Sequence, residues 1–206
     1  MKAWQIVAKE EIAFVEKKQE TLPTDVKIRI SKVALSSTDI AIYEGKKACY
    51  PIIPARSAVG LVSEAHELSG LKKGERVVLS PYILEDPLYR KKDVIVPDVK
   101  VMGFDTDGFV CDFISVPQEN VYPLPEGIKD NDAVFTEQIA LAVKTLSALD
   151  TERGDYVAIL GANTLGLIIA ELCIYYQLVP VLIDVDEAKL ALAENHGVYY
   201  TINSSK

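Results

Sequence analysis

Residues 155–184 read DYVAILGANTLGLIIAELCIYYQLVPVLID, and the order of apolar runs in this stretch decides the fold. The run at 155–160 is typical of a parallel strand that is buried on both faces, and a GANTLG turn follows it at once. A helix is expected after the turn, and the run at 179–184 predicts a second strand. The stretch therefore indicates two parallel strands joined by a helix.

The same pattern continues beyond this stretch. Residues 186–194 predict a second helix that ends before Gly197, and residues 198–202 predict a third strand. The first helix carries an apolar stripe at helical spacing, formed by Leu165, Ile168, Ile169, Leu172 and Tyr176. These elements make a β-α-β-α-β pattern, which is half of a doubly wound sheet.

The GANTLG turn has the features of a site for the pyrophosphate of a dinucleotide. Gly161 closes the strand, Gly166 allows the helix to pack tightly on the sheet, and the amides between them lie at the positive end of the helix. Asp184 ends the next strand, where its carboxylate can accept hydrogen bonds from an adenosine ribose and repel a 2′-phosphate. The turn and this acid therefore favour NAD over NADP.

The turn departs from the usual GxGxxG pattern at its middle glycine, which is Asn163 here. Its side chain is expected where the backbone should approach the phosphates, although asparagine tolerates left-handed backbone geometry. A doubly wound half without a ligand is the alternative interpretation. The residues expected to bind the cofactor are Gly161, Asn163, Thr164, Leu165, Gly166 and Asp184.

The first 127 residues have a different pattern of apolar residues. Short β-branched runs cut by glycine and proline predict strands at 26–35, 57–65, 75–82, 93–97 and 112–117. No helical period is sustained in this part, so a closed β-barrel or a sandwich is expected.

After Gly127 the sequence becomes helical. Asn131 or Asp132 is expected to cap a helix, which then carries Ile139, Val143 and Leu146 at helical spacing. This change from strand-like to helical patterns predicts two domains, residues 1–128 and residues 129–206.

Composition excludes several classes of function. The chain has 206 residues, of which 30 are acidic and 22 basic, and the net charge of -8 works against binding nucleic acid. The first residues lack the apolar core of a secretory signal, and the most apolar region, 157–183, is interrupted by polar residues and a proline. The cysteines Cys49, Cys111 and Cys173 form no CxxC pair, which favours buried thiols in a reducing compartment. We therefore expect a cytoplasmic protein, with no membrane partner, that acts on a small molecule.

The whole chain resembles the medium-chain dehydrogenase/reductase family of zinc alcohol and polyol dehydrogenases. The segments that carry the resemblance are MKAW at 1–4, VALSSTDIAIYEG at 33–45, PIIPARSAVGLVSEA at 51–65, KKGERVVLSP at 72–81, DGFVCDFISVPQENVYPLPEGI at 107–128, TEQIALAVKTL at 136–146 and YYTINSS at 199–205. The resemblance implies an N-terminal GroES-like β-barrel domain followed by the first half of a Rossmann domain. It also implies an NAD-dependent oxidoreductase.

The resemblance also places the metal ligands of the family, and this chain lacks them. Zinc-dependent members have a cysteine where Ser36 stands, and a Gly-His-Glu triplet where Ala55, Arg56 and Ser57 stand. A hydroxyl and a guanidinium are not zinc ligands at neutral pH, so no catalytic zinc is expected. Residues 81–100, where the family has a structural zinc lobe with four cysteines, contain no cysteine, so no structural zinc is expected either.

Four residues are candidates for catalysis through this resemblance. Thr38 matches the Ser or Thr that relays a proton from the substrate hydroxyl, and Asp39 matches an acid behind the metal. Glu137 matches an acidic ligand position, and we expect Arg56 to take the vacated cation position and pair with it, because a buried carboxylate needs compensation. The alternative is that both side chains face solvent. Arg56 or Thr38 could hydrogen-bond a developing oxyanion.

The sequence ends at Lys206, just past the third expected strand, so the second half of a dinucleotide domain is not in it. We expect either a fragment or a reduced protein, and an open sheet edge at 198–202 favours a homo-oligomer. Three functions remain open: a zinc-independent reductase of carbonyls, quinones or activated alkenes, a non-catalytic dinucleotide-binding relative, and a zinc-dependent alcohol or polyol dehydrogenase.

Overall fold

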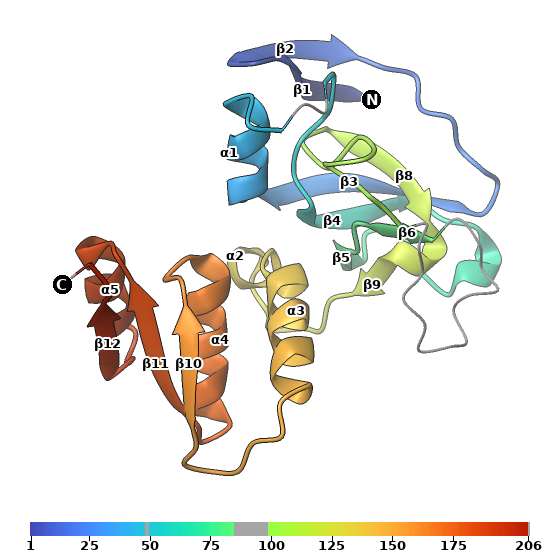
Figure 1. Ribbon diagram of the computed structural model, residues 1–206. Coiled ribbons are helices and arrows are strands. Elements are labelled where there is room, and N and C mark those ends of the chain that lie inside the picture. Colours follow the sequence, from blue (N-terminus) through green and yellow to red (C-terminus); the bar gives the residue numbers. More distant parts are fainter. Residues whose placement is uncertain (48–49, 85–98, 206) are drawn as a thin grey trace. The chain divides into compact units, whose positions relative to one another are not determined.

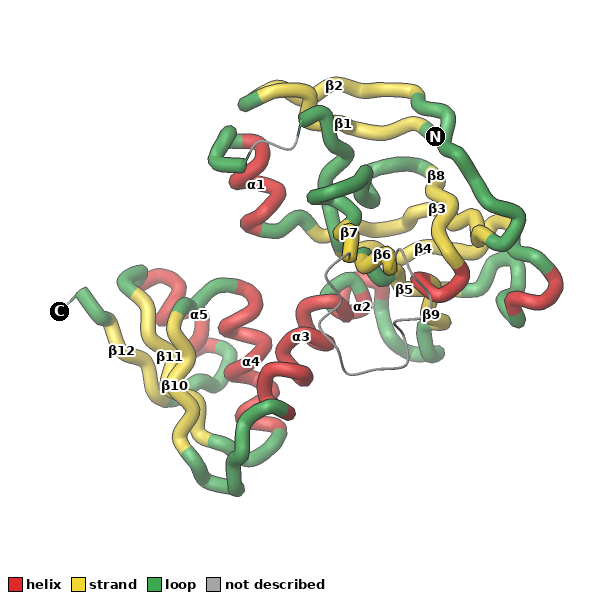
Figure 2. The backbone as a smooth tube through the Cα atoms, turned by 45° about the vertical axis from the view of Figure 1, so that its right-hand side comes forward, coloured by secondary structure: helices red, strands yellow, loops and turns green. Residues whose placement is uncertain are grey.

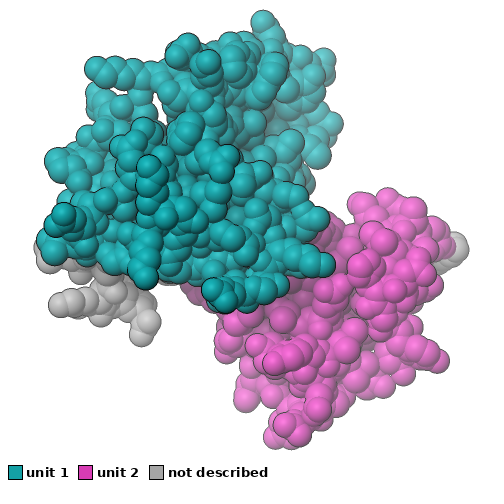
Figure 3. All heavy atoms as spheres, turned by 180° about the vertical axis from the view of Figure 1, so that it is seen from behind, with its two compact units in different colours: residues 1–136 teal, residues 137–206 magenta. Residues whose placement is uncertain are grey.

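The structure is a computed structural model that describes residues 1–47, 50–84 and 99–205. Cys49, the strand expected at 93–97 and most of the segment expected to lack a structural zinc lie outside the described residues. The chain forms two compact units, Met1–Thr136 and Glu137–Lys206, which Figure 3 shows in different colours. The predicted division after residue 128 stays a prediction.

The first unit is built mainly from antiparallel strands, as Figures 1 and 2 show. Its strands are β1 (Lys2–Ala8), β2 (Glu11–Glu16), β3 (Asp25–Ala34), β4 (Ser57–Glu64), β5 (Arg76–Leu79), β6 (Tyr82–Leu84), β7 (Val99–Val101), β8 (Phe113–Pro117) and β9 (Val121–Pro123). A five-stranded sheet has the order β8-β3-β4-β5-β9, and β1-β2 and β6-β7 form two-stranded sheets. In β3 the buried residues Val26 and Ile28 alternate with partly exposed ones, as the period-two pattern predicted.

The largest side chain in the core of the first unit is Phe109, which is fully buried. The same core cluster holds side chains from β3, β4, β5, β8 and β9, together with Ala55 and Met102 from the loops. The loops that carry Ala55 and Met102 therefore meet in the core, where their backbones are packed against the sheet. This arrangement fixes the position of the residues around Arg56.

A short helix in the first unit was not predicted. Helix α1 (Ser37–Tyr43) follows β3, where the sequence showed no sustained helical period. Seven residues span only about two turns, which is too short for a periodic apolar pattern to be recognised. The expectation of a purely β domain was wrong at this point, and Thr38 and Asp39 lie on a helix.

The predicted helix cap after Gly127 was also wrong. Asn131 and Asp132 lie inside a four-residue helix, α2 (Asp130–Ala133), and a separate helix, α3 (Thr136–Ser147), begins only after it. Val134 and Phe135 separate the two helices, and Val134 packs in a small core cluster with Ala133. An apolar anchor therefore interrupts what the pattern presented as one helix.

The second unit has the predicted β-α-β-α-β order, which confirms the predicted fold class. Its elements are β10 (Tyr156–Leu160), α4 (Thr164–Tyr175), β11 (Val179–Asp184), α5 (Glu187–Asn195) and β12 (Tyr200–Asn203). The three strands are parallel in the order β10-β11-β12. In the part of the chain that the structure describes, no helix is both long and apolar enough to cross a membrane.

The burial of this sheet differs from the prediction. Strand β10 was expected to be buried on both faces, yet Tyr156 is 67% exposed and Leu160 is 82% exposed, whereas Ile159 between them is buried. Helix α4 also differs, because its most buried residues are the small ones, Ala170 and Cys173, rather than the predicted stripe. Small residues allow the helix to approach the sheet closely, and hydropathy alone does not distinguish them.

Candidate functional site

The carboxylate of Asp39 organises the start of α1. Its side chain is buried, and Oδ2 accepts hydrogen bonds from the Ser36 backbone N–H at 2.6 Å and the Ser36 hydroxyl at 2.7 Å. Its Oδ1 accepts a hydrogen bond from the Ala55 N–H at 2.8 Å. Asp39 therefore ties the loop that carries Arg56 to the end of β3. The hydroxyl of Ser36 is used in this contact.

The Ala55 backbone is held in an uncommon conformation. Its φ of 76° lies in the left-handed region, where an L-residue with a Cβ is strained. The Phe109 N–H donates to the Ala55 carbonyl at 3.1 Å, and the Gly108 N–H donates to the Ile53 carbonyl at 2.7 Å. A Cβ on Gly108 would lie 2.3 Å from the Ala55 oxygen. A glycine is therefore needed at 108 so that the two loops can come together.

Arg56 follows this clamped residue, and its side chain is partly buried. Its Nε is buried and has no hydrogen-bond partner within the described ranges. Ser57 is buried at the start of β4. The structure thus brings Ser36, Asp39 and the backbone next to Arg56 together in one place, while Thr38 lies partly buried on the same short helix.

Glu137 lies in the first turn of α3, and it belongs to the second unit. The expected pair with Arg56 would join the two units and stays a prediction.

The phosphate turn keeps its two glycines for structural reasons. Gly161 has a φ of 105°, and a Cβ on Gly166 would lie 2.0 Å from the Gly161 carbonyl oxygen. This distance agrees with the expected close packing of the helix. Asn163 is the N-cap of α4, with an extended φ of -84°, and its side chain accepts from the Gly166 N–H at 3.0 Å. The turn is therefore maintained by a cap rather than by left-handed geometry at Asn163.

The amides at the start of α4 are the donors that remain for a ligand. The N–H groups of Thr164 and Leu165 have no hydrogen-bond partner in the part of the chain that the structure describes. Asn163 and Thr164 are exposed, so a ligand can reach this end of the helix. Donors and a positive helix end together suit a phosphate.

Asp184 ends β11 beside this turn. Its Oδ2 accepts from the Ala162 N–H at 2.7 Å, and its Oδ1 accepts from the Asp186 N–H at 2.9 Å. These backbone hydrogen bonds, first that of Ala162, hold the pKa of the Asp184 carboxyl below its ordinary value. The side chain is therefore ionised at neutral pH, as the recognition of ribose hydroxyls requires.

The sequence did not reveal the residues that support the loop around Arg56 and the phosphate turn. Ala162 connects the turn to Asp184, and Gly103 and Gly108 make room for the Ala55 backbone. Alanine in a turn carries no sequence signal of its own. The two glycines stand in the segment MGFDTDGF, 102–109, where turn residues are ordinary, so only the fold shows what they contact.

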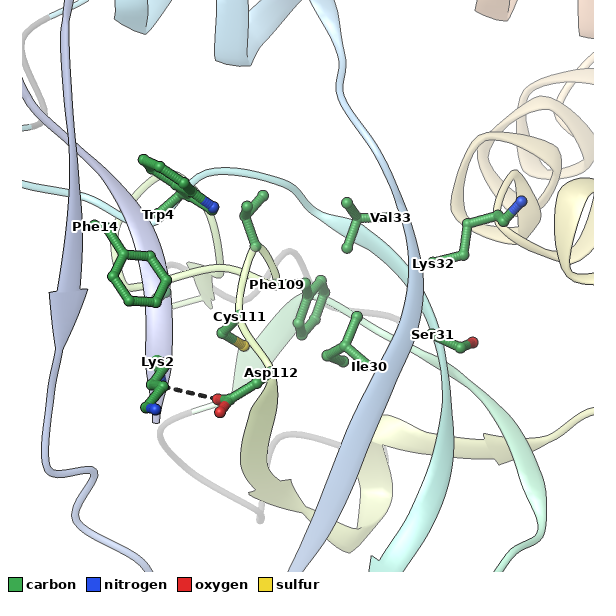
Figure 4. Close-up of a pocket in the computed structure, with 12 residues that line it drawn as sticks. Lys2, Trp4, Phe14, Ile30, Ser31, Lys32, Val33, Phe109, Cys111 and Asp112 are labelled. Atoms are coloured by element: carbon green, nitrogen blue, oxygen red, sulfur yellow. Dashed lines mark hydrogen bonds between the residues drawn. The ribbon is translucent and has the colours of Figure 1, made fainter.

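The first unit also has an open pocket of about 420 Å³, shown in Figure 4, that contains none of the predicted site residues. Trp4 and Phe14 from the β1-β2 hairpin stand on one side of it, and Asp112 accepts a hydrogen bond from the Lys2 backbone N–H at 2.7 Å. Burial raises the pKa of the Cys111 thiol in this pocket to about 12. That thiol stays protonated at neutral pH, so it is a poor nucleophile.

Comparison with known proteins identifies the family. The alcohol dehydrogenase GroES-like domain matches residues 22–126, which is just over half of the 206 residues, so the chain belongs to that family. This chain is 26% identical over 207 residues to an uncharacterized zinc-type alcohol dehydrogenase-like protein of Haemophilus influenzae. The match covers 97% of this chain and 59% of that protein. The chain is 27% identical over 195 residues to the L-threonine 3-dehydrogenase of Mesorhizobium japonicum, covering 89% and 56% of the two chains.

A solved structure shows the same fold. The short chain alcohol dehydrogenase of E. coli CFT073, complexed with the cofactor NADH, superposes with a TM-score of 0.87 and 23% identity, covering all of this chain and 63% of that one. The present chain therefore spans about three fifths of the length of the relatives that it matches. These relatives are named as an alcohol dehydrogenase-like protein and a threonine dehydrogenase.

Proposed function

We propose that this chain contains the GroES-like domain and the adenosine-binding half of an NAD-dependent oxidoreductase that works without a catalytic zinc. The observation that carries the cofactor assignment is the turn before α4, where exposed amides lie next to the ionised Asp184. Thr164 and Leu165 would hold the pyrophosphate through their N–H groups, and Asp184 would accept from the ribose hydroxyls. NAD, when bound, supplies the site that accepts or donates a hydride.

The residues at the family's metal position do not fit zinc. The Ser36 hydroxyl donates to Asp39, and Arg56 presents only donors and a positive charge. Across the described residues, no group of three His, Cys, Asp or Glu side chains is placed to hold a metal ion. Because zinc prefers thiolate, imidazole and carboxylate ligands, we derive no step through a metal.

Without a metal ion, polarisation of the substrate falls to protein donors. The Arg56 guanidinium presents only hydrogen-bond donors, and Thr38 lies on α1 next to Asp39, which accepts from the Ala55 N–H. Either group can donate a hydrogen bond to an oxygen on which negative charge develops. This chemistry suits a small carbonyl or alcohol, or a quinone or activated alkene. The sequence-based expectations of a cytoplasmic address and a homo-oligomer remain part of the proposal.

The second candidate is a non-catalytic dinucleotide-binding relative. Asn163 favours it, because its side chain occupies the Gly166 N–H that a phosphate would otherwise meet. A zinc-dependent dehydrogenase is the third possibility, and it requires that ligands other than Ser36, Arg56 and Ser57 bind the metal. Both are distinguished from the main proposal by experiment.

The first test is a calorimetric titration of the folded chain with NADH and, separately, with NADPH. We expect NADH to bind more tightly. Asp184→Asn should weaken NADH binding by about tenfold, because it removes a charged acceptor, and should bring the two affinities together. A thermal melt of the variant controls for lost stability, since Asp184 also accepts from two backbone amides. Equal, weak binding of both dinucleotides by the original chain would overturn the cofactor assignment.

The second test separates the three functions. Metal analysis of the purified chain should find no stoichiometric zinc, and a stoichiometric zinc would overturn the assignment of Arg56. Oxidation of NADH with a panel of quinones, enones and aldehydes, measured on the longest form of the protein that can be prepared, should show turnover. Tight NADH binding with no turnover on any of these would favour the non-catalytic relative.

A further inference from the structure

Two buried polar atoms in the described part of the first unit have no hydrogen-bond partner. They are Nε of Arg56 and Oγ1 of Thr106, and each lacks a hydrogen bond within residues 1–47, 50–84 and 99–205. A buried polar group without a partner costs about 1 to 3 kcal/mol, and a charged one costs more. Native proteins rarely leave such groups unless a ligand or an ordered water completes them.

Both residues border the same loop. A Cβ on Gly103 would lie 3.2 Å from Cγ of Arg56, so the stem of the arginine runs beside this glycine. The Gly103 N–H in turn donates to the Thr106 carbonyl at 2.7 Å. Arg56 and Thr106 therefore both border one tight turn, and their unpartnered atoms belong to the same neighbourhood of the fold.

The backbone that carries Arg56 is fixed before any ligand arrives. Asp39 accepts from the N–H of Ala55, and the Phe109 N–H donates to the carbonyl of Ala55. The Val110 N–H also donates to the carbonyl of Pro54, at 3.2 Å. An arginine on such a rigid segment loses little conformational freedom on binding, which is the property expected of a recognition residue.

Carboxylates near Arg56 already have other partners. Asp39 accepts three hydrogen bonds from Ser36 and Ala55. Asp107 pairs with Lys17 at 2.5 Å and accepts from the Ile53 N–H at 3.0 Å. Arg56 forms no ion pair in the described part of the chain. Among the described residues of its unit, no acidic side chain is paired with its charge.

We propose that Arg56 and Thr106 bind a carboxylate or phosphate group of the substrate. Resting on the proposed function, this assignment names the substrate class: a small molecule that carries a permanent anion besides the group that reacts. The guanidinium can donate two parallel N–H bonds to two oxygens of the anion, and the Thr106 hydroxyl can donate a third. Arg56 then orients the substrate, which leaves the Thr38 hydroxyl for the reacting oxygen.

The test is a nuclear magnetic resonance titration of the Nε–H signals of the arginines. The Arg56 signal is assigned by its loss in Arg56→Lys. Inorganic phosphate and acetate are added in separate arms, each against sodium chloride of equal ionic strength. We expect a saturable shift of the Arg56 signal with one or both anions and none with chloride. Arg29 is exposed on β3 and serves as the internal control.

Variants sharpen the result. Thr106→Val should weaken binding of the anion by about tenfold, which is the loss expected for a hydrogen bond to a charged group. Arg29→Gln should leave the affinity for the anion unchanged. Glu137→Gln is the decisive comparison, because Glu137 is the acid that the sequence paired with Arg56. If the Arg56 signal ignores both anions in the original chain, or responds to them only in Glu137→Gln, an internal carboxylate occupies the place and the proposal is overturned.

The same samples separate this inference from the cofactor assignment. NADH binding is followed by the fluorescence of the reduced nicotinamide. Binding of NADH without any response of the Arg56 signal would overturn the anion site alone. A saturable anion response without NADH binding would overturn the cofactor assignment and leave an anion-binding GroES-like domain.

Discussion

The loop that carries Arg56 and the phosphate turn at 161–166 have the same kind of backbone contact but present different side chains. In each, a glycine lets one backbone lie against a carbonyl oxygen: Gly108 against Ala55, where a Cβ would stand at 2.3 Å, and Gly166 against Gly161, where it would stand at 2.0 Å. Both glycines are present in this chain. The side chains displayed by the two turns have departed from the family pattern to different degrees.

In the phosphate turn the departure is small, because Asn163 still begins the helix and the acid at the end of β11 is kept. At the Arg56 loop the proposed departure is larger, because the resemblance predicts a metal ligand where Arg56 stands. The comparison teaches that two turns with similar backbone contacts can present side chains of different chemistry. The backbone contacts therefore define where each turn lies, and the chemistry of each turn has to be tested through its side chains.

The largest expected effect comes from Gly166→Ala. The new Cβ would meet the Gly161 carbonyl, so helix and turn must separate, at a cost of about 3 kcal/mol. NADH binding should be lost. Hydrogen exchange of the β10 and β11 amides measures the change in stability. Gly197→Ala is the control, because its φ of 89° is strained but no atom lies within 4 Å of its Cβ, and it should cost only about 1 kcal/mol. Equal stability of the two variants would contradict the packing argument.

Gly108→Ala is the counterpart in the first unit. Its Cβ would meet two carbonyl oxygens, those of Ala55 at 2.3 Å and Pro54 at 2.7 Å, and we expect a loss of about 2 kcal/mol. The loop around Arg56 should shift, so the Arg56 Nε–H signal should move while NADH binding is unchanged. Gly74→Ala is the control for added bulk, because nothing lies within 4 Å of its Cβ; its own φ of 84° is strained, so it should cost only about 1 kcal/mol. A variant that loses NADH binding as well would show that the two turns are not independent.

A smaller effect is expected from Ala55→Gly. Glycine adopts a φ of 76° without strain, which should offset the loss of the buried Ala55 methyl group, so the stability of the first unit should change by less than about 1 kcal/mol. Ala58→Gly, in β4, also loses a buried methyl group but relieves no strain, and it should destabilise by about 1 to 2 kcal/mol. Chemical denaturation of both variants measures the difference. Equal destabilisation by the two substitutions would mean that the loop is not strained.

The sequence predicted the second unit better than the first. Strand β11 begins and ends at the predicted residues, and α5 begins at Glu187, one residue after its predicted start, because Asp186 is its cap. Periodic apolar runs with clear caps are local signals, and they define these elements without help from the rest of the chain. The exposed face of β10 was missed because burial depends on what covers a strand, which its own residues do not encode.

The candidate site could be predicted only where its residues carry their own chemistry. Gly161, Gly166 and Asp184 have roles tied to residue type, and the structure places them together. The unpartnered Nε of Arg56 could not be predicted, because it depends on how Asp39 and Asp107 are occupied by groups distant in the sequence. Hydrogen-bond satisfaction is a property of the packed chain, and no local pattern reveals it.

A weaker effect concerns the pKa values of two carboxyl groups, Asp130 in the first unit and Asp184 in the second. The Arg76 side chain, first by its hydrogen bond, lowers the pKa of Asp130, whereas backbone amides lower that of Asp184. A depressed folded pKa stabilises above the ordinary value near about 4 and loses that contribution as pH falls through the lowered value.

Because the side chains of the Arg76–Asp130 pair are 36% and 34% exposed, its contribution should be under about 1 kcal/mol and should shrink with salt. Carboxyl chemical shifts titrated with and without added salt check this. We expect the pKa of Asp130 to rise with salt and in Arg76→Gln, and that of Asp184 to stay. Equal salt sensitivity would show that Asp184 is held by charge rather than by amides.

The smallest change in stability and the sharpest test of the comparison come from Asn163→Gly. Losing the side-chain cap should cost only a few tenths of a kcal/mol, because glycine is itself tolerated at N-caps. The Gly166 N–H would be released, and a phosphate could approach the backbone more closely, so NADH should bind several-fold more tightly. Asn163→Asp keeps an acceptor for the cap but adds a negative charge, and it should weaken NADH binding. If Asn163→Gly leaves the affinity unchanged while the helix stays folded, the amides of Thr164 and Leu165 are sufficient for the cofactor, and the asparagine is a neutral departure rather than a step toward losing the site.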